Sequence, residues 1–230
     1  SIVASVEEGR IIYANIRKFV YYLLSCNLGE ILTIFLATLF GWDLPLTAIQ
    51  LLWLNLLTDG APALALGLEK GEPDIMEQPP RPPEEPIINK AMRQGIVVQT
   101  VAITAATLGA FLLGKCWFPH NLAAAQTMAF VTLSTSELLR AYTARSERYS
   151  IFQIGVLSNK YMQISVAASI ALLLAAVYVP FLDPIFNTAF VGPREWLAMT
   201  PLILLPAAAA EITKLLGRWR ARRWALVAAS

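Results

Sequence analysis

The residues that build most metal and redox centres are nearly absent from this chain of 230 residues. It has one histidine, His120, and two cysteines, Cys26 and Cys116, which lie in different regions and form no Cys-x-x-Cys pair. We therefore expect neither a disulfide framework nor a zinc or thiolate metal site. The first residues, SIVASVEEGR, lack the apolar core of a secretory signal peptide, so none is predicted.

Charged residues are also scarce, at 15% of the chain, whereas hydrophobic residues make up 57%. This balance is unusual for a soluble domain, and a net charge of +2 gives no indication of a nucleic-acid partner. We predict an all-α, polytopic membrane protein: a six-transmembrane-helix bundle with one long stalk helix and a broken second span. Each predicted span is near the roughly 20 residues that cross a bilayer. The spans are residues 19–40, 48–67, 94–114, 122–140, 161–182 and 196–214.

The distribution of positive charge supports six spans with both termini on one side. Of the 18 Lys and Arg residues, only Lys115 and Arg194 fall on the opposite side. Because loops rich in Lys and Arg stay in the cytosol, both termini are predicted to be cytosolic. The polar loop 68–92, which carries many prolines, lies on the same side.

The second span, IQLLWLNLLTDGAPALALG, carries polar residues at its centre. Asn55, Thr58 and Asp59 stand at positions i, i+3 and i+4 and therefore share one face of a helix. Gly60 and Pro62 follow directly and favour an opening of the helix that exposes backbone carbonyls. Polar groups beside a break in a membrane helix indicate an ion site. A kinked span with hydrogen-bonded polar residues is the alternative.

Three acids lie deep in the predicted spans: Glu30 in the first, Asp59 in the second and Glu137 in the fourth. Three such charges would cost on the order of 8–10 kcal/mol unless protons, an arginine or cations compensate them. Asn27 adds a neutral oxygen beside Glu30, so the donor set suits Ca²⁺, with Mn²⁺ as second choice. The alternatives are an ion pair between Glu137 and Arg140 and interhelical hydrogen bonds from the asparagines.

Two further polar residues are left out of this site. Cys26 is adjacent to Asn27 in the sequence but points to another side of the helix, and we interpret it as a packing residue. Glu211 is followed three residues later by Lys214, which predicts an ion pair on the helix surface near the cytosol.

Four segments, in this order and spacing, resemble the C-terminal half of a P-type cation-transporting ATPase: VEEGRIIYANIRKF, SCNLGE, LLWLNLLTDGAPALALG and DIMEQPPR. The most similar group is the calcium pumps of the sarco/endoplasmic-reticulum type and their bacterial relatives. The resemblance implies that the six spans are the fifth to tenth membrane helices of such a pump. It also implies an end of the phosphorylation domain at 1–12, a stalk and first span at 13–41, the ion-binding span at 48–67, a cytosolic coupling loop at 68–92, four further spans at 93–216 and a basic cytosolic tail at 217–230.

In that family, Ca²⁺ is bound by the Asn and Glu of an NxGE motif, by an Asn, Thr and Asp of the sixth helix, and by an acid on the eighth. The resemblance therefore implies a metal site for transported Ca²⁺ whose ligands are Asn27, Glu30, Asn55, Thr58, Asp59 and Glu137.

Motifs that the family uses for catalysis are not in this sequence, among them DKTGT, TGES and GDGxNDxPAL, and neither is the PEGLP of the fourth helix. We therefore expect no catalytic residue here, and a chain that forms most of the cation pathway of an ATP-driven calcium pump. The expected partners are the lipid bilayer and a missing N-terminal half that binds ATP and Mg²⁺. The short loop after the third span favours a bacterial plasma membrane. The alternatives are a manganese or other cation pump, a stand-alone channel or carrier subunit, and a structural scaffold.

Overall fold

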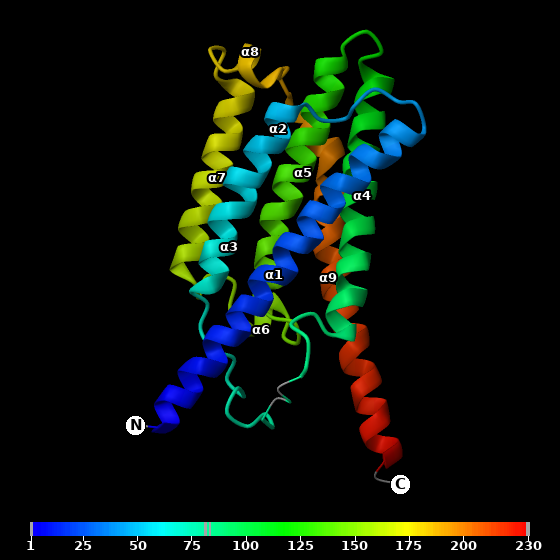
Figure 1. Cartoon of the computed structure of the whole chain (residues 1–230). Coiled ribbons are helices and arrows are strands. Elements are labelled where there is room, and N and C mark those ends of the chain that lie inside the picture. The colour runs from blue at the N-terminus through cyan, green and yellow to red at the C-terminus, as the bar shows by residue number, and fades with distance from the viewer. Residues whose placement is uncertain (1, 81, 83, 229–230) are drawn as a thin grey trace.

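The structure is a computed structural model that describes residues 2–80, 82 and 84–228, with side chains described up to residue 219. These residues form helices and connecting loops without a β-strand, which confirms the predicted all-α class. Both ends of the chain lie at the same end of the bundle (Figure 1). The elements are α1 (Ile2–Leu39), α2 (Ala48–Trp53), η1 (Leu54–Asp59), α3 (Gly60–Gly67), α4 (Lys90–Trp117), α5 (Leu122–Ala144), α6 (Ile151–Ile154), α7 (Lys160–Tyr178), α8 (Asp183–Phe186) and α9 (Pro193–Ala228).

Five helical stretches are long and apolar enough to cross a membrane: α1, the continuous stretch Ala48–Gly67, α4, α7 and α9 as far as Trp219. They correspond to five of the six predicted spans. The remaining span is α5, which is as long as the others but less apolar. It packs against α1, α4, α7 and α9, and most of its residues are buried. Because α5 faces other helices on most sides, it tolerates polar side chains, and the protein is a multi-pass helical membrane protein.

Three of the long helices begin at an asparagine that caps them. The side chains of Asn89, Asn121 and Asn159 each accept a hydrogen bond from the backbone N–H three residues further on. This satisfies one of the free donors at the start of α4, α5 and α7. The local sequence therefore sets where these helices begin.

The helix α1 is continuous over 38 residues, as the uninterrupted sequence between the stalk and the first span predicts. It crosses the bundle obliquely, and its first turns lie beside loop 68–89 (Figure 1). Its central part lies close to α4, since a Cβ atom on Gly29 would be 2.7 Å from Cγ2 of Ile103. The glycine therefore allows the close approach of a neighbouring helix.

The break predicted in the second span takes the form of a π-helical segment, η1, between α2 and α3. Pro62 has no N–H to donate, so the helix lacks the donor that would bond the Thr58 carbonyl in an α-helix or the Leu57 carbonyl in a π-helix. Hydroxyl groups of other helices replace that donor. The hydroxyl of Tyr22 lies 2.9 Å from the Thr58 carbonyl oxygen, and that of Ser169 lies 2.9 Å from the Leu57 carbonyl oxygen. The helix stays intact because α1 and α7 satisfy the carbonyls that proline releases.

Candidate cation-binding site

The three deep acids come from three different helices and lie inside the bundle. Glu30 is on α1, Asp59 ends η1 and Glu137 is on α5. Their exposed fractions are 5%, 1% and 0%, so none of them faces lipid. Electrostatic repulsion acts on Asp59 from Glu30 and on Glu137 from both other acids. The fold therefore brings together three carboxyl groups that are distant in the sequence, at positions 30, 59 and 137.

Each of these acids has a neutral hydrogen-bond donor beside it. The amide of Asn55 donates a hydrogen bond to Oε2 of Glu30 at 2.8 Å. The hydroxyl of Thr58 lies 3.5 Å from Oε2 of Glu137 and donates to the Leu54 carbonyl in its own helix. The hydroxyl of Tyr22, which donates to the Thr58 carbonyl, is also 3.3 Å from Oδ1 of Asp59. Five of the six residues expected to bind a cation therefore lie in one cluster.

One oxygen of each carboxylate has no hydrogen-bond partner among the described residues. These atoms are Oε1 of Glu30, Oδ2 of Asp59 and Oε1 of Glu137, and all three are buried. A buried carboxylate oxygen without a donor is costly, and three of them in mutual repulsion are more so. Protons or a cation must therefore compensate the cluster.

Arg140 does not compensate it. Its guanidinium group lies 4.5 Å from the centre of the Tyr21 ring and donates a hydrogen bond to Thr143 at 3.1 Å. No ion pair joins Arg140 to Glu137 in the part of the chain that the structure describes. The ion pair considered from the sequence is therefore not formed.

Asn27 is the one expected ligand that the structure does not connect to the acids. Its amide donates a hydrogen bond to the Leu23 carbonyl of its own helix at 2.8 Å, and the residue is half-buried. Within the described residues, no hydrogen bond links it to Glu30, Asp59 or Glu137. A role for Asn27 as a ligand stays a prediction.

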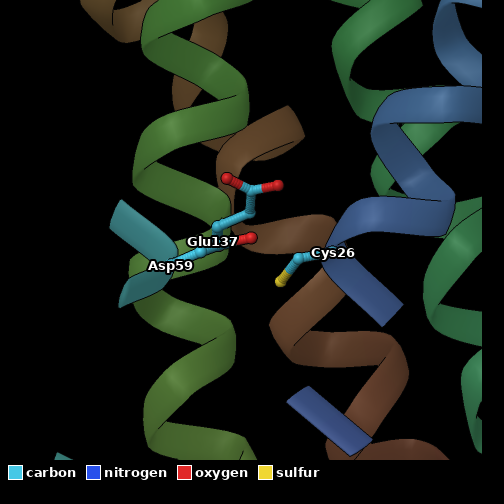
Figure 2. Close-up of side chains that lie close together, drawn as sticks. All are labelled: Cys26, Asp59 and Glu137. Atoms are coloured by element: carbon cyan, nitrogen blue, oxygen red, sulfur yellow. The ribbon is translucent and has the colours of Figure 1, made fainter. Parts of the chain in front are cut away.

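Cys26, which we interpreted as a packing residue on another side of the helix from Asn27, lies in the buried core and also faces the acids. The thiol is fully buried, and Figure 2 shows it directed towards Asp59 and Glu137. Its sulfur and one oxygen of each of these carboxylates lie within 4.8 Å of one another. The packing role is confirmed, but the nearness to the acids was not expected, although Tyr22, Cys26 and Glu30 are spaced by four residues and share one face of α1. That spacing would have located the thiol.

The pair predicted at the end of the last span is present. Lys214 Nζ lies 2.8 Å from Oε1 of Glu211, and it also donates to the backbone carbonyl of Thr143 at 2.8 Å. The lysine thereby connects α9 to the end of α5. Glu211 is paired locally and takes no part in the acid cluster.

Comparison with known proteins identifies the family. The family described as "Cation transporting ATPase, C-terminus" matches residues 43–216. A calcium-transporting ATPase of Bacillus subtilis is 41% identical over 206 residues, which cover 90% of this chain and 23% of that protein. Calcium-transporting ATPase type 2C member 2 of Homo sapiens is 35% identical over 218 residues, which cover 94% of this chain and 23% of that protein. The chain thus spans about a quarter of the length of the curated relatives it matches, and it belongs to the cation-transporting ATPase family as its C-terminal membrane region.

Proposed function

We propose that this chain forms most of the transmembrane cation pathway of an ATP-driven pump and that Ca²⁺ is the transported ion. The observation that carries the proposal is the meeting of three buried carboxylates, each with one oxygen that no donor satisfies. Structural ion pairs do not explain them, because no ion pair within the described residues involves any of the three acids. A cargo cation would compensate these charges when bound, and protons would do so when it leaves.

The donor types favour calcium. Ca²⁺ takes about six to eight oxygen ligands at roughly 2.3–2.6 Å, often with carboxylates that contribute both oxygens. Glu30, Asp59 and Glu137 supply up to six carboxylate oxygens, and Thr58 and Asn55 add a hydroxyl and an amide. The names of the related proteins, which are calcium-transporting ATPases, point to the same ion.

Asp59 has the position of a bridging ligand. It stands at the junction of η1 and α3 and interacts electrostatically with Glu30 and Glu137, which come from helices on two sides of it. With three carboxylates against the two charges of one calcium ion, a second cation or a proton has to share the pocket. We propose that the two oxygens of Asp59 serve two ions.

The edge of the cluster at Asn55 leaves room for further ligands. Asn55 is exposed as a residue, although its amide contacts Glu30. Asn27 is a candidate on the α1 side if its amide releases the carbonyl of its own helix.

We propose that ATP and Mg²⁺ act on other domains of the full-length protein, that both termini face the cytosol, and that the membrane is a bacterial plasma membrane. The match to the protein of Bacillus subtilis supports the last point.

The test is calcium uptake by membrane vesicles that contain the full-length protein with single substitutions. Even residues that merely support a metal ligand change affinity by about 10–100-fold when they are replaced. We therefore expect Asp59→Asn and Glu137→Gln to raise the half-saturating Ca²⁺ concentration at least about tenfold, or to abolish uptake. Glu211→Gln is the matched control, because that acid lies in a span outside the cluster. Uptake by Asp59→Asn with the half-saturation of the unmodified protein would refute the proposal.

A further inference from the structure

The thiol of Cys26 completes a second kind of ligand set within the acid cluster. Its sulfur, one oxygen of Asp59 and one oxygen of Glu137 lie within 4.8 Å of one another. Figure 2 shows the three side chains close together between their helices. All three residues are at most 1% exposed. Oδ2 of Asp59 and Oε1 of Glu137 have no hydrogen-bond partner in the described part of the chain. A buried thiol thus lies beside two buried carboxylates, each of which has one oxygen without a hydrogen-bond partner among the described residues.

The separation of these atoms suits a small divalent cation. Zinc binds thiolate sulfur at about 2.3 Å and carboxylate oxygen at roughly 2.0–2.2 Å in a tetrahedral arrangement, so two of its ligand atoms lie about 3.5 Å apart. The three ligand atoms here lie within 4.8 Å of one another, so side-chain adjustments of about 1 Å would bring them to that geometry.

The chemistry of the set differs from that of the oxygen ligands proposed for calcium. Calcium is a hard cation that takes oxygen ligands, whereas thiolates select zinc and softer metals. A serine in place of Cys26 could hydrogen-bond a carboxylate equally well, but it could not supply a thiolate. The sulfur therefore widens the range of cations that the pocket can hold.

We propose that Cys26, Asp59 and Glu137 form a site for a zinc-like, thiophilic divalent cation, which competes with the cation bound by the acids. Binding replaces the proton on the thiol with a metal–sulfur bond, and the proton leaves to water without any redox step. With three anionic ligands at short distances, the ion is held more tightly than a hard cargo ion and blocks the pocket. The competition rests on the proposed function, whereas the binding itself does not.

The first experiment measures competition in vesicles that contain the full-length protein. Calcium uptake is titrated with Zn²⁺ in the unmodified protein and in Cys26→Ser, Cys26→Ala and Cys116→Ser. Cys116 is exposed and far from the acids in the sequence, so its variant is the matched control for the loss of a thiol. We expect Zn²⁺ to compete with Ca²⁺, and both Cys26 variants to raise the ratio of the zinc inhibition constant to the half-saturating calcium concentration by at least about tenfold. An unchanged ratio in Cys26→Ser would overturn the proposal.

The second experiment measures binding without transport. Cd²⁺ is added to the purified full-length protein, and the ultraviolet charge-transfer absorption of the cadmium–thiolate bond is recorded. We expect the same absorption in the unmodified protein and in Cys116→Ser. In Cys26→Ser, the absorption should decrease by the contribution of one cadmium–thiolate bond. Asp59→Asn should weaken cadmium binding. Identical absorption in Cys26→Ser and the unmodified protein would overturn the proposal, whether or not calcium is transported. A thiolate signal in a protein without calcium uptake would instead refute the calcium pump and keep this site.

Discussion

The strongest structural prediction concerns a buried ion pair at the end of the bundle that holds both termini. Arg145 directly follows α5, and Glu69 follows the second span; their side chains are 0% and 6% exposed. The guanidinium binds the carboxylate through two hydrogen bonds, from Nε to Oε2 at 2.7 Å and from Nη2 to Oε1 at 3.1 Å. Its other N–H groups donate to the carbonyls of Gly155 and Val156, both at 2.9 Å, and to the hydroxyl of Ser158. One side chain therefore joins α5, the second span and the segment before α7.

The substitution Arg145→Met removes all of these donors and leaves the carboxylate of Glu69 buried. Loss of one partner of a buried ion pair costs about 3–5 kcal/mol, because the remaining charge is uncompensated. We expect Glu69→Gln to be costly as well, since it leaves the guanidinium buried without its counter-ion. The double variant Arg145→Met, Glu69→Gln removes both charges, so its cost should be smaller than the sum of the single costs by about 1–3 kcal/mol.

The assay is thermal unfolding of the purified full-length protein, with calcium uptake measured beside it. The matched control is Arg148→Met, because Arg148 lies 3.5 Å from Asp74 with 60% of its side chain exposed. An exposed pair of this kind contributes about 0–1 kcal/mol. The reasoning is refuted if Arg145→Met lowers the unfolding temperature no more than Arg148→Met, or if the two buried substitutions are simply additive.

Three further predictions follow from the same structure. Burial raises the pKa of Glu69, but hydrogen bonds from Arg145 and Asn159 outweigh it and hold that pKa below its ordinary value. The carboxylate therefore stabilises the fold above about pH 4 and loses this effect as the pH falls through the lowered pKa, so the difference in unfolding temperature between the unmodified protein and Glu69→Gln should shrink in acid. A Cβ atom at Gly114 would lie 2.6 Å from a backbone Cα of α5, whereas one at Gly109 would lie 3.4 Å from the end of a side chain in α9. Gly114→Ala should consequently cost about 1–3 kcal/mol in unfolding measurements and Gly109→Ala little, and equal effects would contradict the packing. Because the acid cluster needs protons when its cation leaves, calcium uptake should drive an opposite proton movement, which a pH dye in the vesicles would record; uptake without any pH change would count against it.

The spans were largely predictable because they depend on bulk properties of the sequence. Length and apolarity, compared with the thickness of a bilayer, locate five spans directly, and the distribution of Lys and Arg favours a sixth. The direction of the spans stays a prediction. That sixth span, α5, is the one whose composition alone is ambiguous. Its polar residues face other helices, and a count of apolar residues contains no information about neighbours in space.

The local geometry of the second span was only partly predictable. Gly60 and Pro62 indicate where the helix loses hydrogen bonds, and this proved to be the right region. Whether the backbone opens or forms a π-helical turn depends on residues of other helices. The hydroxyls of Tyr22 and Ser169 donate hydrogen bonds to backbone carbonyls of this segment. The nearness of Cys26 to the acids was missed for a different reason: its position was compared with that of its neighbour Asn27 and not with those of Tyr22 and Glu30, one turn away on either side.

The low apolarity of α5 and the location of the acid cluster have one physical cause. A carboxylate such as Glu137 can be fully buried only on a helix that other helices shield from lipid, and α5 is that helix. The other two acids reach it from α1 and from the end of η1, so a bound cation would hold three separate helices together. Glu30 reaches the second span through its hydrogen bond with Asn55, and the first part of the same helix, α1, contacts loop 68–89 through Arg10. A tilt of α1 that separates Glu30 from Asn55 would change the ligand set, and by linkage a bound cation must oppose that tilt with the same free energy.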